Sequence, residues 1–511
     1  RGEVTAVMNS HIVSALFLSC ASALVLTGCS SVINSHRQKV SMMEAFEEGN
    51  HGVVMNEIGY KLREPAFYNS SVVNSGDEVM WRLEAGSMNF YTGNFAESVA
   101  QFKQAEALIA GYDDRAKISL RDGGEELGSS FTNMNILPYR GFCRDRIALS
   151  IYKSLAYLGM NDESAFRAQL RRLRKEQKKV QEDYQAFFES ENAEVKAARE
   201  ANPEAAEKAD KAAASEEQLE NDPQNEEFSA AMKEVRKIAH KGYGGFLNPA
   251  AIYLSGLGSL RDESYDNARI DFKRLYEAMP QNVEFQRYYV TVLHLAGRRI
   301  PRELKHVKPF DFPLDRDCVY VLFANGRGAA FRQIAVYFPF MTAWPMCEFY
   351  PAPFDEISVE ADGVKHSSVI LADMDGILAQ EFQERLPGMI TRIVLSTLIK
   401  EGSYYGSLVA IWNADMNPLA KCIVWCAVAV GGAGYRVAMN TADTRSWETL
   451  PKEFQLTQFP MPENRKLKIY SGKGELLNTV EIPPDAKSAV VFVAAPGPQN
   501  STAFVLPIRM R

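Results

Sequence analysis

The sequence WRLEAGSMNFYTGNFAESVAQFKQAEALI, residues 81–109, decides the fold of the first half of the chain. Apolar residues recur at helical spacing on both sides of Gly93-Asn94, and a glycine at this point can adopt the positive φ of a tight turn. Small residues let two helices cross closely, while an aromatic side chain such as Phe102 fills the groove between them. We therefore predict two packed helices joined by a turn.

The same pattern of two helical segments around a turn returns three more times. It is found at 39–62, at 152–173 and at 253–280, where a further apolar helix follows. The spacing resembles a tetratricopeptide repeat, but the copies are irregularly placed, so we expect a degenerate set of tetratricopeptide-like hairpins over 38–300. An unrelated all-α domain of paired helices is the alternative. Either arrangement offers a groove for a partner, and neither needs catalysis.

A targeting signal precedes these helices. A largely apolar run from Ile12 to Leu26 closes on Leu26-Thr27-Gly28-Cys29 and has the parts of a secretory signal. About 15 apolar residues are short against the roughly 20 that a membrane-spanning helix needs, although a spanning or core helix is the alternative.

The four residues that end in Cys29 resemble the bacterial lipobox. The resemblance implies cleavage before Cys29, a diacylglyceryl group on its sulfur and acylation of the new amine, so residues 1–28 would be a signal peptide and 29–37 a lipidated tether. Ser30 follows the cysteine in place of the Asp that retains lipoproteins at the inner membrane. We therefore expect an anchor in the outer membrane, with the protein facing the periplasm.

Composition limits the other possibilities. A chain of 511 residues with 46% hydrophobic and 24% charged residues is expected to form two or three cores. The net charge of -7 provides no basic surface for nucleic acid, so no nucleic-acid partner is expected. The seven cysteines are scattered and odd in number, which is not a disulfide framework.

Residues 190–227 differ from their surroundings. They contain no aromatic residue and few large apolar ones, so they cannot bury enough surface to order themselves. Their Ala, Glu and Lys content favours helix, while Pro203 and Pro223 interrupt it. We expect a projecting helix that frays into a mobile charged insertion; a partner-binding arm is the alternative.

Strand patterns begin after Pro301 and predict a mixed α+β C-terminal domain at 310–511. Two strands around the Asn325-Gly326 turn are expected to form a hairpin. A helix should start at Asp373, break at Pro387-Gly388 and resume until Lys400. Further strands are expected at 357–360, 368–371, 467–470, 476–482, 489–493 and 503–508. The predicted fold class is thus α+β.

Few residues suggest a reactive centre. Cys422 and Cys426 would share a helix face, but no His or second Cys pair lies nearby, so buried thiols are favoured over a metal site. We find no pair of nucleophile and base, and we expect neither metal nor cofactor.

The most pointed polar cluster contains Asp443, Arg445 and Trp447: an acid, a fork-shaped cation and an indole within five residues. It could hold an anionic ligand or a peptide. Alternatively the cluster could have a structural role and stabilise its own loop. Asp443 and Arg445 would then pair with each other or with the helix charges Glu381, Glu384, Arg385 and Arg392.

Several of these segments together resemble an uncharacterised bacterial lipoprotein family with tetratricopeptide-like helices and a distinct C-terminal α/β domain. The segments are the repeat-like hairpins, Asn325-Gly326-Arg327-Gly328, residues 381–387 with Arg392, and residues 442–447 with Leu450-Pro451. Membership would imply no established activity and no catalytic residues.

Our hypothesis is a cell-envelope lipoprotein that serves as a non-catalytic scaffold or binding module for another envelope protein. The alternative is an envelope enzyme or ligand-binding protein with a site around Asp443, Arg445 and Trp447.

Overall fold

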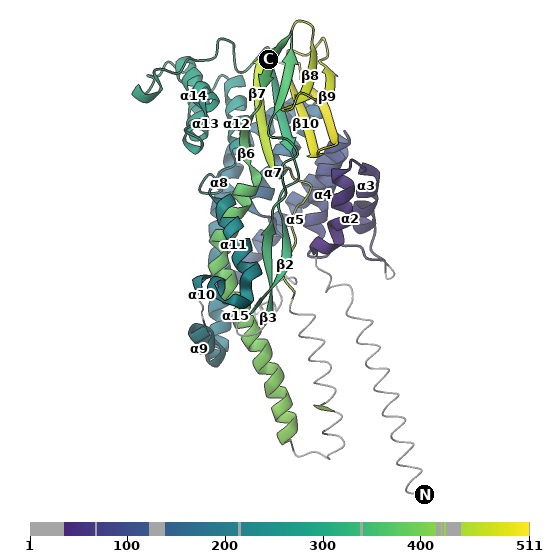
Figure 1. The fold of residues 1–511 in the computed structure, drawn as a ribbon, viewed down its shortest axis with the longest axis vertical. Coiled ribbons are helices and arrows are strands. Elements are labelled where there is room, and N and C mark those ends of the chain that lie inside the picture. The colour runs from purple at the N-terminus through teal and green to yellow at the C-terminus, as the bar shows by residue number, and fades with distance from the viewer. Residues whose placement is uncertain are drawn as a thin grey trace.

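The computed structural model describes residues 35–66, 69–121, 138–212, 216–337, 341–414, 421, 424–425 and 441–509. The first part of the chain is helical and the later part is rich in strands (Figure 1), which confirms the predicted α+β class. The signal, Cys29, Cys422 and Cys426 lie outside the described residues.

The four predicted hairpins are all pairs of helices. They are formed by α2 (Ser35–Glu47) with α3 (His51–Leu62), α4 (Glu78–Tyr91) with α5 (Phe95–Arg121), α7 (Cys143–Gly159) with α8 (Glu163–Ala201), and α12 (Pro249–Arg261) with α13 (Tyr265–Ala278), which α14 (Val283–Leu295) follows.

Close approach of the paired helices explains the small residues. A Cβ placed on Gly86 of α4 would lie 2.4 Å from the Phe102 ring of α5. One placed on Gly256 of α12 would lie 2.8 Å from the Phe272 ring of α13. Gly93 has a φ of +76°, as the predicted turn between α4 and α5 requires.

The strands form three sheets. The largest has the order β11 (Asn500–Ile508), β10 (Ser488–Gly497), β1 (Cys318–Asn325), β7 (Glu453–Pro460) and β6 (Val369–Asp373). β1 and β10 run parallel, and the other neighbours are antiparallel. A four-stranded sheet has the order β5 (Val364–Ser367), β4 (Ile357–Ala361), β8 (Lys466–Ser471) and β9 (Leu476–Glu481), and a two-stranded ribbon pairs β2 (Ala330–Tyr337) with β3 (Met341–Glu348).

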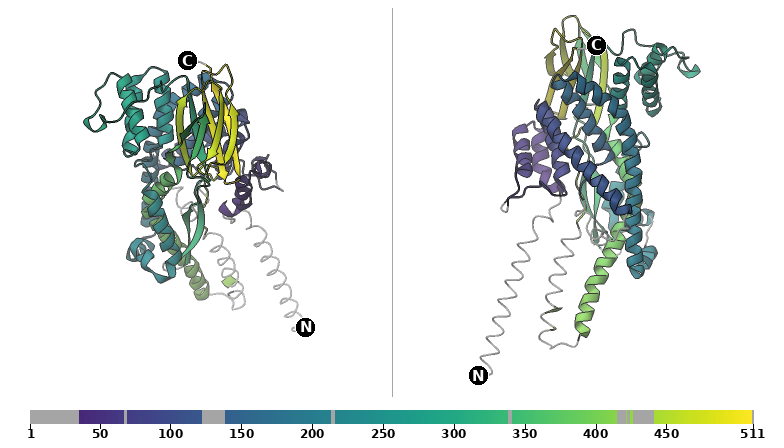
Figure 2. Two further views of the ribbon diagram at one scale, coloured as in Figure 1. Left: turned by 45° about the horizontal axis from the view of Figure 1, so that its top comes forward. Right: turned by 180° about the vertical axis from the view of Figure 1, so that it is seen from behind.

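The central strand β1 is buried on both faces, which builds a three-layer arrangement. Tyr320 and Leu322 point into a core shared with the helices, whereas Val319 and Val321 point into a core shared with β4 and β8. Helices therefore cover one face of the five-stranded sheet, as the rear view in Figure 2 shows, and the four-stranded sheet covers the other.

The predicted hairpin around Asn325-Gly326 is wrong, although both strands and the turn are present. Both edges of β1 are occupied, by β7 and β10, so β2 leaves the sheet and pairs with β3 instead. The predicted strands at 357–360, 368–371, 467–470, 476–482, 489–493 and 503–508 are confirmed as β4, β6, β8, β9, β10 and β11, whereas β3, β5 and β7 were not predicted.

The predicted helix break at Pro387 is also wrong. A single helix, α15 (Met374–Asn413), continues through the proline. Leu386 and Ile390, on either side of it, are buried in a core formed with α11 (Glu226–Ala239), β2 and β3. This burial outweighs the lost backbone hydrogen bond, because packing supplies most of the stability of a helix in a protein.

The charged segment 190–227 is helical where the structure describes it, as its composition predicted, and its mobility stays a prediction. It forms the end of α8, then α9 (Pro203–Ala212), α10 (Glu216–Asn221) and the 3-10 helix η2 (Pro223–Asn225). Leu219 is buried, and the Asn225 amide exchanges two hydrogen bonds with the backbone of Tyr337, at 3.1 and 2.8 Å. Leu219, Ala198 and the paired Asn225 amide thus hold the described part of this segment against its neighbours without aromatic residues.

The described strands all lie after the predicted boundary near residue 300, together with α15, but the hydrophobic core crosses this boundary. Phe90 of α4 and Tyr152 of α7 lie 4.9 and 6.0 Å from Phe492 of β10, measured between ring centroids. The helices and the five-stranded sheet therefore share one core. Within the described ranges, we find no helix with the length and apolar character to cross a bilayer.

Candidate functional site

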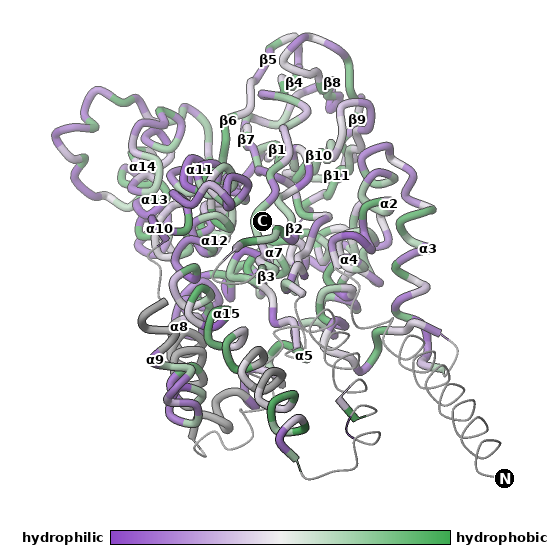
Figure 3. Tube along the Cα trace, turned by 60° about the horizontal axis from the view of Figure 1, so that its bottom comes forward, coloured by the Kyte–Doolittle hydropathy of each residue, from purple (hydrophilic) through white to green (hydrophobic). Residues whose placement is uncertain are grey.

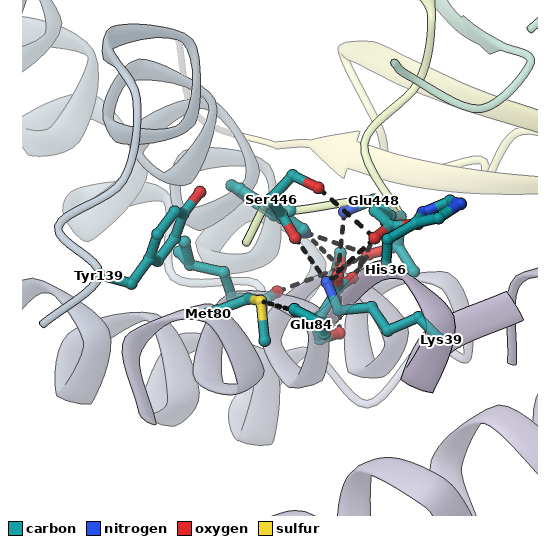
Figure 4. A network of polar contacts seen from close by, with 12 residues as sticks. His36, Lys39, Met80, Glu84, Tyr139, Ser446 and Glu448 are labelled. Atoms are coloured by element: carbon teal, nitrogen blue, oxygen red, sulfur yellow. Dashed lines mark hydrogen bonds and ion pairs between the residues drawn. The ribbon is translucent and has the colours of Figure 1, made fainter. Parts of the chain in front are cut away.

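Residues Thr444–Leu450, which we call the buried strip, run without helix or strand through the junction between the helices and the sheet. Each is at most 5% exposed, although five of the seven have polar or charged side chains. The strip lies against α2, α4 and α7, and Figure 4 shows its polar contacts. Buried backbone groups that lack a sheet or helix partner need side-chain partners, and these helices supply them.

Glu84 of α4 holds the middle of the strip. Its carboxylate accepts hydrogen bonds from the backbone N–H groups of Glu448 and Thr449, at 2.9 and 3.1 Å, and from the Thr449 hydroxyl at 2.6 Å. The Glu84 side chain is completely buried. It therefore acts as a local substitute for the neighbouring strand that this stretch lacks.

Lys39 of α2 balances this negative charge. Its Nζ lies 2.7 Å from Glu84 Oε1 and 3.5 Å from Glu448 Oε1, and it donates a hydrogen bond to the Ser446 carbonyl (Figure 4). Burial alone would lower the pKa of Lys39, but the two carboxylates outweigh it and raise that pKa above its usual value. Burial also raises the pKa of Glu448, but Lys39 and His36 lower it by more, so the net shift of that pKa is downward.

His36 extends the network to the first turn of α2. Its Nε2 lies 3.2 Å from Glu348 of β3, and its Nδ1 lies 3.6 Å from Glu448. The neighbouring carboxylates, Glu348 first and then Glu448, raise the pKa of His36 from 6.5 to about 9. Residues 35–37, which were predicted as tether, therefore belong to a helix that is tied into the fold.

Trp447 is fully buried among helices. Its indole N–H donates to Ser87 Oγ and Thr449 Oγ1, at 3.1 and 3.0 Å. Its carbonyl accepts a hydrogen bond from Arg144 of α7 at 3.2 Å, and its ring centroid lies 5.7 Å from that of Phe102. The indole thus fills the groove between the second and third hairpins.

Arg445 pairs within its own loop and across to the helices. Its Nε and Nη2 donate to the two carboxylate oxygens of Asp443, at 2.8 and 2.6 Å, and its Nη1 lies 3.2 Å from Asp77, the residue before α4. Its guanidinium is also 6.0 Å from the Tyr139 ring. Burial lowers the pKa of Arg445, but Asp443 and Asp77 raise it further, so the net shift is upward.

Glu381 and Arg392, the other predicted members of the cluster, lie on α15. Glu381 accepts a hydrogen bond from the backbone N–H of Cys143 at 2.8 Å and lies 3.7 Å from Arg385. Burial raises the pKa of Glu381 to about 7. Arg392 is buried further along the same helix. Glu381 thus orients the start of α7. The contacts described above for Asp443, Arg445 and Trp447 do not include Glu381 or Arg392.

The Asn325-Gly326-Arg327-Gly328 turn meets the end of the buried strip. The backbone N–H of Gly328 donates to the Leu450 carbonyl at 2.7 Å. Arg327 lies 2.7 Å from Glu47 at the end of α2, and its guanidinium is 3.6 Å from the Tyr350 ring centroid. Two segments that the sequence marked as distinctive are therefore neighbours at one junction.

Sequence reasoning missed Lys39, Glu84 and Arg144, the charged residues that hold the strip. The available signal was their position on largely apolar helix faces, such as Glu84, which shares a face with Met80, Trp81 and Met88. All three have completely buried side chains. Because they are paired inward, the arrangement stabilises the junction between helices and sheet.

Reactive groups are few in the described part of the chain. No cluster of three or more His, Cys, Asp or Glu side chains with metal-binding geometry is found there. The thiols of Cys143, Cys318 and Cys347 are buried, and burial raises the pKa of Cys318 to about 12. An apolar cavity of about 20 Å³ lies between α12 and the sheet, next to Tyr253 and Tyr320, and has room for about one water molecule.

Comparisons with protein-family models, with curated proteins and with solved structures found no match.

Proposed function

We propose that the chain is a cell-envelope lipoprotein, acylated at Cys29 and anchored in the outer membrane, that faces the periplasm. Its tetratricopeptide-like hairpins serve as a scaffold for another envelope protein. No nucleic acid, metal or cofactor takes part in this role.

One observation carries the proposal: the best candidates for a ligand site are engaged in holding the fold. Asp443 and Arg445 are paired, and Trp447 has no exposed surface. These contacts favour a rigid platform over a reaction site. The alternative, an envelope enzyme or ligand-binding protein with its site around the same three residues, gains no support from them.

The position of α2 supports the anchoring part of the proposal. The helix begins at Ser35, only a few residues after Cys29, and an extended chain of that length reaches about 20 Å. Because His36 and Lys39 fix α2 to the core, acylation at Cys29 would hold the whole platform close to the bilayer.

The last helices offer a surface for the partner. Ile270 of α13 is 44% exposed, and Val283 and Leu295 of α14 are 61% and 43% exposed. The terminal repeat of a helical array ordinarily has a polar outer face, so we infer that these exposed apolar side chains are contacts for the partner.

A site-specific photo-crosslinker tests the partner. Placed at Ile270 in the full chain in cells, it should capture one discrete envelope protein, whereas a crosslinker at Val364 of β5, which is 56% exposed, should not. Ile270→Glu should abolish both the capture at a neighbouring crosslinker position and the cellular role, and Val364→Glu should leave both intact. Equal behaviour of the two variants would reject this surface.

Replacing the acylated cysteine tests the anchor. Cys29→Ser should prevent incorporation of labelled palmitate and leave an unprocessed or soluble protein. If the variant still fractionates with membranes as the wild type does, and the wild type takes up no palmitate, the protein is not a lipoprotein.

A further inference from the structure

The end of α15 extends beyond the rest of the fold (Figure 1). Its last twelve residues, 402–413, include no charged residue. Val409 is 58% exposed and Trp412 is 66% exposed, the largest exposed fraction among the large hydrophobic residues that the structure describes. Figure 3 shows hydrophobic positions along this end of the helix.

A second short segment lies beside the same end. Lys421 Nζ donates to the carbonyl of Trp412 at 2.9 Å, which satisfies one of the free carbonyls at the helix end. Val424 and Trp425 follow in helical conformation and are 37% and 36% exposed. We call residues 402–413 with Lys421, Val424 and Trp425 the apolar tip.

The distribution of tryptophans sets the apolar tip apart from the rest of the protein. The chain has five, and Trp81, Trp344 and Trp447 are at most 2% exposed. The two exposed ones, Trp412 and Trp425, both lie in the tip. Tryptophan and lysine together are typical of the boundary between lipid headgroups and acyl chains, where the indole is half buried and the ammonium reaches phosphate.

We propose that the apolar tip rests in the headgroup region of a lipid bilayer. Twelve helical residues measure about 18 Å, which is short against a hydrocarbon core of about 30 Å, so the tip enters one leaflet and does not span. A helix suits this environment because its backbone hydrogen bonds are satisfied internally. Lys421 would sit at the depth of Trp412 and pair with headgroup phosphates.

This surface would act beside the lipid on Cys29 and does not depend on it. Two or three acyl chains on Cys29 would already hold the protein on the membrane, but they would leave its orientation free, and a second contact fixes that orientation. An apolar tip in the bilayer would orient the scaffold relative to the membrane.

Tryptophan quenching by brominated lipid tests the proposal on the full chain. In vesicles of phosphatidylethanolamine and phosphatidylglycerol, brominated phosphatidylcholine should quench only Trp412 and Trp425, since the other three are inside the fold. Trp412→Phe and Trp425→Phe should each remove part of the quenching, and the double variant should remove all of it.

A matched pair of charge substitutions completes the test. Val409→Glu should reduce the quenched fraction about tenfold, because a carboxylate resists transfer into the bilayer. Val364→Glu on β5, where the wild-type side chain is 56% exposed, should leave it unchanged.

Two results would overturn the proposal: the absence of quenching, and quenching that persists in the double tryptophan variant. If quenching is absent and Val409→Glu dissociates a dimer, the tip is a contact between two copies. Quenching without palmitate incorporation would uphold the tip and reject the lipoprotein proposal, so the two fail separately.

Discussion

Lys39 Nζ lies 2.7 Å from Glu84 Oε1, and neither side chain has exposed surface. The pair links α2 to α4, and both residues also bond the buried strip at Ser446, Glu448 and Thr449. A buried ion pair is stable only when further hydrogen bonds satisfy its remaining donors and acceptors, and the strip supplies them. One pair of charges thus connects α2 and α4 to the segment that leads into β7.

Arg445 should stabilise the junction without contacting a ligand. Arg445→Ala is expected to lower the free energy of unfolding by about 3 kcal/mol, since Asp443 loses a buried partner and Asp77 is partly in water. Arg445→Lys should restore only part of the loss, because the planar fork that binds both Asp443 oxygens is gone. Urea denaturation of the full chain measures both.

An exposed arginine provides the control for this series. Arg298 is 56% exposed and pairs with Asp266. Arg298→Ala should change the free energy of unfolding by at most about 0.5 kcal/mol. If Arg445→Ala unfolds like the wild type but loses its cellular role, Arg445 serves a ligand instead.

His36 should make stability depend on pH above neutrality. Its pKa in the folded protein, about 9, is higher than the 6.5 of the unfolded chain, so its contribution is complete below about pH 6.5 and disappears as pH rises through 9. The difference in urea midpoint between the wild type and His36→Gln should therefore shrink from pH 6 to pH 9. A difference that stays constant over this range would show that the imidazolium does not pair with Glu348 and Glu448.

Glu381 should make stability depend on pH below neutrality. Burial raises its pKa to about 7, so the folded state holds the proton more tightly than the unfolded chain, and stability falls as pH rises from about 4.5 to 7. Glu381→Gln removes this titration and should gain about 2–3 kcal/mol relative to the wild type between pH 5 and pH 8. Parallel stability curves for the two proteins would mean that the carboxyl is not buried as described.

Local sequence signals predicted much of the fold. Gly93 with Phe102, and Gly256 with Phe272, identified paired helices because a close crossing needs a small residue opposite a ring. Six of the later strands, β4, β6, β8, β9, β10 and β11, were also predicted from local sequence. The pairing of β1 with β10 could not be predicted, because Val319 and Ala489 become neighbours only through the tertiary fold. The helix break at Pro387 was predicted wrongly for the same reason: burial of α15 outweighs the tendency of proline to end a helix.

The candidate site was predicted only in part. Asp443, Arg445 and Trp447 were recognisable as an unusual group of side chains, and the pairing of Asp443 with Arg445 is local. Lys39 and Glu84 were missed although they lie on largely apolar helix faces, because a charged residue within a helix is ordinarily solvated. Their burial depends on a strip that lies about 360 to 410 residues further along the chain.

The central claim is that the buried strip is a structural junction held by Lys39 and Glu84, and a double-mutant cycle on these residues tests it most directly. Lys39→Met alone should cost about 3–5 kcal/mol, because it leaves Glu84 buried without its counter-ion, while Lys178→Met on an exposed pair should cost at most about 0.5 kcal/mol.

The decisive measurement is the free energy of unfolding of Lys39→Met, Glu84→Gln and the double variant, determined by urea denaturation of the full chain. The structure predicts that the double variant is at least about 2 kcal/mol more stable than the sum of the single losses implies. Losses that add within about 0.5 kcal/mol would contradict the claim, since the two side chains would then not act as one unit.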